Sequence, residues 1–379
     1  MINSKTSALG IIFPNYYDHL VPELVNVRLM ASIPFASRYR MIDFILSSMA
    51  NCDINNISIM VNNNYHSLMD HLGSGREWDL VRKNGGLNIF PPYAESTGIK
   101  YTGRVATLAS ILGFLRAQKE KYVVMTDTNT AVNFDFKAMI NAHIETGADV
   151  TVAYTQEVIP EGLINQPDEK GYYYTYAISE GRINKIYVNP KNEGIQNLAL
   201  GIFVIEREML IDLVNTAFVR GQKYFERDIL LTQLGKLKVY GYKYEGYAAR
   251  ITGLKEYFNE NMKLLDDYNL DALFTPAPVY TKIRDDNPSR YIAGAVVKNT
   301  MAADGCVIEG EVENCVLFRG VKIAKGAKVK NCILMQDTVV EAGADIEYIV
   351  SDKNVTISAG KELKGSDSFP VYIGKLQTV

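Results

Sequence analysis

Three arginines near the N-terminus are the clearest candidates for binding a charged ligand. Arg28, Arg38 and Arg40 lie close together in the sequence. A guanidinium group carries a planar fork of N–H donors that matches the oxygens of a phosphate group. The cluster therefore predicts binding of a phosphorylated small molecule. The alternative is that these arginines pair with local carboxylates, such as that of Asp43.

Composition narrows the classes of protein that need to be considered. The net charge of −3 gives no basic surface, so nucleic-acid binding is not expected. The four cysteines form no CxxC pair and the four histidines lie elsewhere, so zinc is not expected. No apolar run approaches the length of a membrane span, and residues 1–5 lack the features of a signal peptide. We therefore expect a cytoplasmic protein with reduced thiols.

The first two-thirds of the chain alternate short apolar runs with helical patterns. Strands are predicted at 8–13, 57–61, 122–125 and 150–154, and helices at 41–51, 105–119 and 136–146. This alternation predicts an α/β fold with a mainly parallel sheet and helices on both faces. Ligands of such folds bind beyond the carboxyl ends of the strands, so the loops after the strands are the candidate binding elements.

The last quarter of the chain is a repeat. Residues 312–328, 329–345 and 346–362 align without a gap at a period of 17. Positions in register include Asn314, Asn331 and Tyr348, and Gly326, Gly343 and Gly360. Apolar residues recur about every six positions within each unit, which predicts a triangular β-solenoid with glycines at its corners. The alternative, an antiparallel β-sandwich, lacks the necessary hairpin signals.

The change of pattern divides the chain into two predicted domains. Residues 1–265 form the α/β domain and residues 291–379 the solenoid. The segment between them, 266–290, contains Pro276, Pro278 and Pro288 and is predicted to be an ordered surface linker.

Residues 34–47 read P-F-A-S-R-Y-R-M-I-D-F-I-L-S and resemble the P-F-G-G-K-Y-R-I-I-D-F-x-L-S segment of bacterial ADP-glucose pyrophosphorylases (glucose-1-phosphate adenylyltransferases). Further matching segments lie at 75–80, 89–92, 101–103, 200–203 and 257–262. Members of this family convert ATP and glucose 1-phosphate to ADP-glucose and pyrophosphate. The resemblance implies a Rossmann-like nucleotidyltransferase domain followed by a left-handed parallel β-helix of hexapeptide repeats.

The sequence departs from the family where the nucleotide and its metal should bind. The family has G-G-x-G-x-R-L after the first strand, whereas this chain has Phe13, Pro14, Asn15, Tyr16, Tyr17 and Asp18. Without glycine the backbone is not expected to approach phosphate, and Asp18 is expected to repel it. The two family carboxylates align with Asn129 and Arg250, and Asp127 replaces the first only after a local two-residue shift. No metal is therefore expected on this chain, although a catalytic partner would need Mg²⁺.

Other positions of the family's substrate site also differ. Val188 and Asn189 stand where the resemblance implies a glutamate and a lysine beside the sugar phosphate, and Ala199 replaces a serine. Met30 replaces a lysine, and Arg104 lies in the segment that corresponds to the family's G-T-A-D/N-A. Because several charge-stabilising groups are missing together, catalysis by this chain alone is not expected.

Some bacteria carry a second pyrophosphorylase-like subunit of the GlgD type, and this sequence resembles that type. The resemblance implies a heterotetramer with a catalytic paralogue, assembled partly through the β-helix. It also makes Arg28, Arg38 and Arg40 candidates for binding a phosphorylated effector. Asn62–Asn64 align with a loop thought to carry signals in the family, although such a run is more often a polar turn. Trp78 is expected in the core.

Three alternatives remain open. The chain could be an active homotetrameric adenylyltransferase, in which Asp127 and another carboxylate bind the metal. It could be a hexapeptide-repeat acyltransferase, but these generally use a histidine base and no histidine follows His143. It could also be a binding module that senses a sugar phosphate or nucleotide without an enzyme partner.

Overall fold

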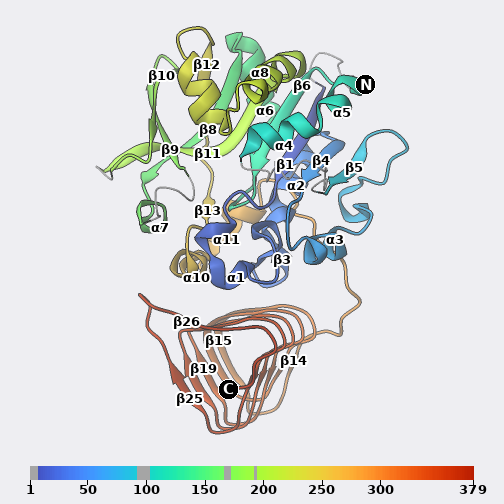
Figure 1. The fold of residues 1–379 in the computed structure, drawn as a ribbon. Helices are drawn as coiled ribbons and strands as arrows, with labels where there is room; N and C mark the ends of the chain where they lie inside the picture. Colours follow the sequence, from blue (N-terminus) through green and yellow to red (C-terminus); the bar gives the residue numbers. More distant parts are fainter. Residues whose placement is uncertain (1–6, 92–102, 166–171, 192–193) are drawn as a thin grey trace.

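The computed structural model describes residues 7–91, 103–165, 172–191 and 194–379. An α/β region occupies the upper part of the molecule and a triangular β-helix the lower part (Figure 1). The C-terminus lies in the β-helix. The predicted fold class is confirmed.

A nine-stranded sheet forms the centre of the α/β region, in the order β5-β4-β1-β6-β11-β8-β12-β10-β9. Its strands are β1 (Ala8–Phe13), β4 (Asn56–Met60), β5 (Gly86–Phe90), β6 (Tyr122–Asp127), β8 (Val150–Val158), β9 (Tyr174–Ser179), β10 (Arg182–Val188), β11 (Ile195–Glu206) and β12 (Val239–Lys243). The four strands from β5 to β6 are parallel, as the sequence predicts. Beyond them the sheet is mixed, because β11 runs antiparallel to both β6 and β8. Buried apolar residues cover both faces of the sheet.

Helices pack around this sheet and beside the β-helix (Figure 1). They are α1 (Pro22–Val25), α2 (Met41–Asn51), α3 (His66–Leu72), α4 (Arg104–Ser110), α5 (Leu112–Ala117), α6 (Phe136–Thr146), α7 (Glu161–Ile164), α8 (Arg207–Val219), α9 (Leu231–Gln233), α10 (Leu254–Lys263) and α11 (Asp267–Phe274). The predicted helices at 41–51 and 136–146 are present. The single helix predicted at 105–119 is wrong: it is broken at Ile111, because this β-branched residue and Gly113 both lower helix propensity.

Short elements connect these larger ones. They are the helical turns η2 (Asp18–Leu20), η3 (Met30–Ser32), η4 (Arg76–Trp78) and η5 (Phe225–Leu230), and the strand pairs β2 (Pro34–Phe35) with β3 (Tyr39–Arg40) and β7 (Thr130–Val132) with β13 (Ala248–Arg250).

The β-helix consists of short parallel strands stacked coil upon coil. They are β14 (Arg290–Tyr291), β15 (Val296–Ala302), β16 (Val307–Ile308), β17 (Glu311–Leu317), β18 (Lys322–Ile323), β19 (Lys328–Lys330), β20 (Ile333–Leu334), β21 (Val339–Val340), β22 (Asp345–Glu347), β23 (Ile349–Ser351), β24 (Thr356–Ile357), β25 (Glu362–Lys364) and β26 (Val371–Ile373). Val312 pairs with Val329, which pairs with Ile346, so the predicted 17-residue register is confirmed. Gly326, Gly343 and Gly360 have φ of 77°, 71° and 66°, a backbone conformation that favours glycine.

A shared core joins the α/β region to the β-helix. Phe44 and Tyr257 of the α/β region pack there with Val316 and Ile333, on the face of the β-helix formed by β17, β20, β23 and β26. The segment at 266–290 begins with α11, whose Leu273 is buried in the same core, and continues without helix or strand to β14. The β-helix is therefore packed against the α/β region over an apolar surface.

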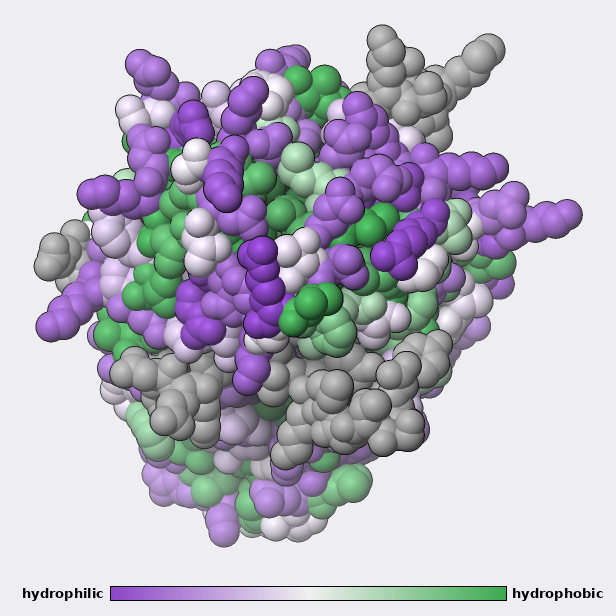
Figure 2. All heavy atoms as spheres, turned by 45° about the horizontal axis from the view of Figure 1, so that its top comes forward, coloured by the Kyte–Doolittle hydropathy of each residue, from purple (hydrophilic) through white to green (hydrophobic). Residues whose placement is uncertain are grey.

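At the end of the α/β region away from the β-helix, hydrophilic and hydrophobic side chains are interspersed over the surface (Figure 2). Among the described residues, no helix has both the length and the apolar character needed to cross a membrane.

Candidate functional site

Three buried charged residues meet at the carboxyl ends of β1 and β6. Arg104, at the start of α4, forms ion pairs with Asp127, the last residue of β6, and with Glu226 of η5. Only 1% of Arg104, 4% of Asp127 and 2% of Glu226 is exposed. We call these three residues the Arg104 cluster. It lies where an α/β fold of this kind places its ligand.

Aromatic rings enclose the guanidinium group of this cluster. Its carbon lies 4.0 Å from the ring centroid of Tyr16, 5.3 Å from that of Phe203 and 5.5 Å from that of Phe13. Contacts at these distances are favourable cation–π interactions, particularly away from water. Tyr17 packs edge-on against Tyr16, with 5.1 Å between ring centroids. The loop after β1 therefore covers Arg104 with tyrosine side chains.

The rest of this loop is held by backbone hydrogen bonds. The carbonyl of Pro14 accepts hydrogen bonds from the amide of Ala31 (3.0 Å) and the hydroxyl of Thr128 (3.2 Å). The carboxyl of Asp18 accepts one from the amide of Met30 (2.7 Å), and burial raises its pKa to about 7. The carboxyl of Asp18, which we expected to repel phosphate, therefore caps a backbone amide.

The residues at the metal position do not fit a magnesium ion. Burial raises the pKa of Asp127 to about 6, and Arg104 is paired with its carboxylate. Asn129 is buried, and its carbonyl accepts a hydrogen bond from the amide of Ile251. Arg250 pairs with Glu157, with 2.9 Å between Nη2 and Oε1. An arginine is thus paired with Asp127, and another stands at the second aligned position, where a fixed cation opposes binding of Mg²⁺. No cluster of three or more His, Cys, Asp or Glu that could hold a metal is found in the described ranges.

The residues at the positions implied for sugar binding contact other residues of the chain. The carbonyl of Ala199 in β11 accepts a hydrogen bond from Nη1 of Arg250 (3.0 Å). The side chain of Asn189 accepts one from the amide of Tyr173 (3.0 Å), while Val188 packs against the core of the α/β region. Met30 is buried in the core shared with the β-helix. All four residues therefore have contacts within the folded chain.

A second site lies between the α/β region and the β-helix. This pocket, which we call the interdomain pocket, has a volume of about 260 Å³. Six cationic side chains line it: Arg38, Arg40, Lys282, Arg284, Arg319 and Lys353. Asp70 supplies the single carboxylate in the lining, and His71 is also present. The pocket is therefore strongly positive.

Burial and mutual repulsion destabilise the charges of this pocket. Burial, together with the nearby charges of Arg40 and Arg28, lowers the pKa of Lys353 to about 7. Burial also lowers the pKa of Arg40 to about 10, and burial and Arg38 lower the pKa of Arg319. Few carboxylates compensate, since the nearest to Arg319 is Asp286 at 3.9 Å. A bound anion would relieve this repulsion.

The structure separates the three arginines predicted to bind an effector. Arg38 and Arg40 line the interdomain pocket. The guanidinium of Arg40 donates to the carbonyl (2.6 Å) and hydroxyl (3.0 Å) of Ser67, whereas the carboxylate of Asp43 accepts a hydrogen bond from the backbone amide of Arg40 (2.9 Å). Arg28 is buried outside the pocket and pairs with Asp352 of the β-helix at 2.6 Å. Arg28 therefore connects the two regions.

Comparison with known proteins identifies the family. The nucleotidyl transferase model matches residues 26–245, and the GlmU-like C-terminal hexapeptide model matches residues 282–368. The glycogen biosynthesis protein GlgD of Bacillus subtilis (strain 168) is 34% identical over 323 residues, which cover 85% of this chain and 82% of that protein. GlgD of Geobacillus stearothermophilus is 36% identical over 324 residues, with the same two coverages. The glucose-1-phosphate adenylyltransferase of Bacillus mycoides (strain KBAB4) is 30% identical over 309 residues, 79% of each chain. The chain belongs to the bacterial ADP-glucose pyrophosphorylase family, and to its GlgD type.

Several residues of the two candidate sites in this GlgD-type chain were missed by the sequence analysis, although the 17-residue repeat could have indicated some of them. Arg319, Gln336 and Lys353 all line the interdomain pocket and follow one another at 17-residue intervals. They occupy the same position in successive coils, so the repeat register predicts that they form a column. Lys282 and Arg284 lie in the segment assigned as a linker. Glu226 has a weaker signal, as a charged residue among the buried Phe225, Ile229 and Leu230.

Two further predictions for this GlgD-type chain concern Trp78 and the run Asn62–Asn64. Trp78 is buried in the core and lies edge-on to His71, with 5.9 Å between ring centroids. His71 in turn pairs with Asp43 at 2.5 Å. Asn62–Asn64 follow β4, and Asn64 has a positive φ of 53°, as in a polar turn. Of the family-like segments, residues 92 and 101–102 lie outside the described residues.

Proposed function

We propose that this chain is a regulatory subunit of ADP-glucose pyrophosphorylase that has no catalytic activity of its own. It would act in the cytoplasm, in glycogen biosynthesis, by modulating a catalytic paralogue within a heterotetramer. The observation that carries this proposal is the Arg104 cluster, in which an arginine and two carboxylates are buried and paired with one another at the carboxyl ends of β1 and β6, where a nucleotide would be expected to bind.

The electrostatics of the cleft support the loss of activity. Nucleotidyl transfer requires cations that stabilise charge on the moving phosphates and a metal held by carboxylates. In this chain Arg104 and Arg250 are neutralised by Asp127, Glu226 and Glu157. A magnesium-bound triphosphate would have to break these pairs before it could bind, and breaking a buried one, such as that of Arg104 with Asp127, costs about 3–5 kcal/mol.

The interdomain pocket supports a regulatory role. Its cations come from the α/β region (Arg38, Arg40), from the segment that precedes the β-helix (Lys282, Arg284) and from the β-helix itself (Arg319, Lys353). A phosphorylated effector bound there would contact all three parts. Since we also propose that the β-helix contributes to tetramer assembly, effector binding would couple the α/β region to the subunit contacts.

The decisive experiment compares this chain, its catalytic paralogue and a mixture of the two. ADP-glucose formation from ATP and glucose 1-phosphate is measured with Mg²⁺, and assembly is followed by size-exclusion chromatography. We expect no product from this chain alone, a mixed complex, and altered activity or effector response of the paralogue. Product formed by this chain alone would favour the active homotetramer, and an unaffected paralogue would refute the regulatory role.

A point variant tests the effector site within the mixed complex. Arg40→Ala should abolish or strongly reduce the effector response, because Arg40 lines the interdomain pocket. Arg116→Ala, at an exposed position of α5, is the matched control and should leave the response unchanged. An unchanged response of Arg40→Ala would exclude this pocket as the effector site.

A further inference from the structure

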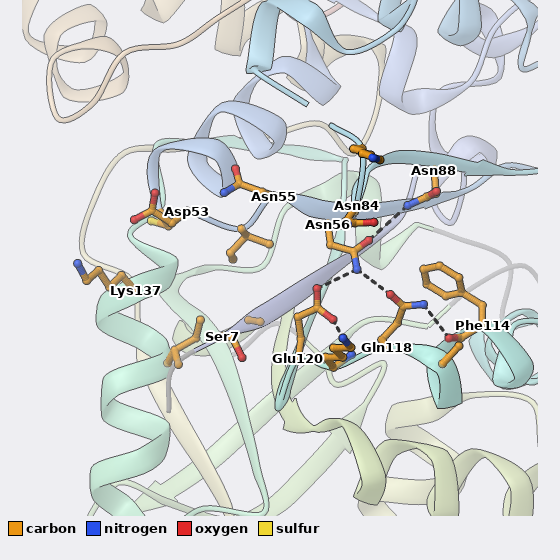
Figure 3. A pocket seen from close by; sticks show the side chains of 18 residues that line it. Ser7, Asp53, Asn55, Asn56, Asn84, Asn88, Phe114, Gln118, Glu120 and Lys137 are labelled. Carbon is orange, nitrogen blue, oxygen red and sulfur yellow. Dashed lines mark hydrogen bonds between the residues drawn. The ribbon is translucent and has the colours of Figure 1, made fainter. Parts of the chain in front are cut away.

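A third pocket lies at the edge of the central sheet opposite the Arg104 cluster. Its volume is about 1010 Å³. The loops before β1, β4, β5 and β6 line it, together with the first turn of α6 (Figure 3). These are the amino ends of parallel strands, whereas the Arg104 cluster lies at their carboxyl ends. We call this the amide pocket.

Carboxamide side chains dominate the polar lining of the amide pocket. They are Asn55, Asn56, Asn84, Asn88 and Gln118. Three lysines (Lys83, Lys119, Lys137) are opposed by two carboxylates (Asp53, Glu120), so the charges nearly cancel. The interdomain pocket, by contrast, has six cations and one carboxylate. The amide pocket therefore suits a neutral polar ligand better than a polyanion.

A hydrogen-bond network holds the floor of this pocket in place. Asn56 is 5% exposed and donates to the side chains of Gln118 and Glu120, both at 2.9 Å. It accepts a hydrogen bond from Asn88 at 3.3 Å, and Gln118 donates to the carbonyl of Phe114 at 3.0 Å (Figure 3). Because these side chains are fixed before any ligand binds, little entropy is lost on binding.

Two further amides are available for a ligand. The side chains of Asn55 and Asn84 line the pocket but form no hydrogen bond with any other described residue. Each can donate two hydrogen bonds and accept two. A sugar hydroxyl is itself both donor and acceptor, so a pair of adjacent hydroxyls matches the two ends of a carboxamide.

An aromatic ring borders the same amides. Phe114 is half-buried and lies beside Gln118 and Asn88 (Figure 3). It packs edge-on against Phe90, with 5.0 Å between ring centroids. A ring fixed in this way offers an apolar surface next to the hydrogen-bonding groups. The C–H face of a pyranose ring can pack on such a surface while its hydroxyls reach the amides.

We propose that the amide pocket binds a neutral glucose oligosaccharide, such as the end of a glucan chain. Pockets for small ligands usually measure about 300–1,000 Å³. This one, at about 1010 Å³, has room for several sugar rings. The inference goes beyond the proposed regulatory role and takes from it only the glycogen pathway as the source of the ligand. Glucan binding would bring the enzyme complex to the polymer that its product extends.

Isothermal titration of the full chain with maltoheptaose tests this proposal. We expect saturable binding, with no competition by ATP or inorganic phosphate. The double variant Asn55→Ala/Asn84→Ala should weaken maltoheptaose binding at least tenfold, because both amides with free hydrogen-bonding groups are removed. Phe114→Ala should weaken it severalfold.

The controls separate binding from folding and from the regulatory role. Asn63→Ala removes an exposed amide beyond the opposite end of β4 and should leave affinity unchanged. Asn55→Ala/Asn84→Ala should retain the wild-type melting temperature and the wild-type effect on the catalytic paralogue. Absence of maltoheptaose binding by the wild-type chain would overturn the proposal, as would full affinity in the double variant. Neither result would affect the test of the regulatory role.

Discussion

The Arg104 cluster and the interdomain pocket both gather arginine, but they differ in how its charge is balanced. Arg104 has two carboxylates, Asp127 and Glu226, and all three residues are buried. The interdomain pocket gathers six basic side chains around one carboxylate, and its half-buried Lys353 has a lowered pKa. Charges paired within the chain stabilise a closed site, whereas unbalanced charges favour an anion from solution. We therefore expect substitutions in the Arg104 cluster to lower the stability of the chain, and substitutions in the interdomain pocket to lower its affinity for an anion.

The largest expected effect is that of Arg104→Met. Methionine keeps much of the packing volume but leaves Asp127 and Glu226 buried without a cation. Loss of one partner from a buried ion pair costs about 3–5 kcal/mol in the free energy of unfolding. Urea unfolding measures this loss. Burial raises the pKa of Asp127 to about 6 in the wild-type chain although Arg104 lowers it, so removal of Arg104 should raise that pKa further. The deficit should then shrink as the pH falls towards 6 and the carboxylate of the variant takes up a proton.

The matched control for Arg104→Met is Arg227→Met. Arg227 is 35% exposed and pairs with Asp228, so its loss should cost at most about 1 kcal/mol. The neutral triple variant Arg104→Met/Asp127→Asn/Glu226→Gln should recover part of the stability lost by Arg104→Met. If Arg104→Met loses no more stability than Arg227→Met, the Arg104 cluster does not stabilise the closed cleft.

The sequence predicted the β-helix in most detail, because its pattern is local. Each coil pairs with the next one along the chain, so the 17-residue period fixes which residues lie side by side, as in the series Val316, Ile333 and Val350. The central sheet was predicted less completely. The antiparallel strand β11 pairs with β6 and β8, which are distant from it in the sequence, and no repeat in the sequence indicates this pairing.

Residues of the candidate sites were predicted only where a single short segment of the sequence could be compared with the family pattern. The loop at Phe13–Asp18 and the substitutions at Asn129 and Arg250 could be read from single segments. The pairing of Arg104 with Glu226 could not, because 122 residues separate them. Likewise, Arg40 and Lys353 meet only because an apolar core packs the β-helix against the α/β region.

The next largest effect is expected for Arg319→Ala, on ligand binding. Arg319 is 9% exposed and lines the interdomain pocket. Hydrogen bonds to charged groups contribute about 1.5–3 kcal/mol, so phosphate affinity should fall about tenfold or more. Titration calorimetry with inorganic phosphate measures this loss. The free energy of unfolding should change little, because removal of one cation relieves the others of repulsion.

Arg116→Ala is the control for Arg319→Ala, since it removes an exposed arginine outside the pocket. Unchanged phosphate affinity in Arg319→Ala would show that Arg319 does not contribute to binding an anion in this pocket. A stability loss as large as that of Arg104→Met would show that Arg319 is a structural charge, and the contrast between the two sites would fail.

A smaller effect is expected from pH, through Lys353. Its pKa is about 7 in the folded chain and 10.5 ordinarily, so the free chain binds fewer protons than the unfolded chain between these values. Stability of the free chain should therefore rise with pH in this window. Lys353 faces Arg40, Arg28, Asp352 and Lys375, and a bound anion favours its protonated form. Binding should then take up a proton above about pH 7, and affinity should fall severalfold from pH 7 to pH 8.5.

Sulfate is the suitable probe for this dependence on pH, because its charge is constant over the range. Calorimetric titrations in buffers of different ionisation enthalpy measure the proton uptake directly. In Lys353→Met the uptake should disappear and sulfate affinity should become almost independent of pH. Equal proton uptake in Lys353→Met and in the wild-type chain would assign the titration to another group.

The smallest effect is expected for Asp70→Asn. Asp70 is the single carboxylate in the lining of the interdomain pocket, is 75% exposed, and lies 3.4 Å from Lys282. Exposed ion pairs contribute about 0–1 kcal/mol, so its neutralisation should tighten phosphate binding only about twofold. The gain should vanish at about 1 M salt, where charges are screened within about 3 Å. Glu145→Gln, at an exposed position of α6, should change nothing. Weaker phosphate binding by Asp70→Asn would mean that Asp70 orients Lys282 towards the ligand, and the interdomain pocket would then depend on an internal pair as the Arg104 cluster does.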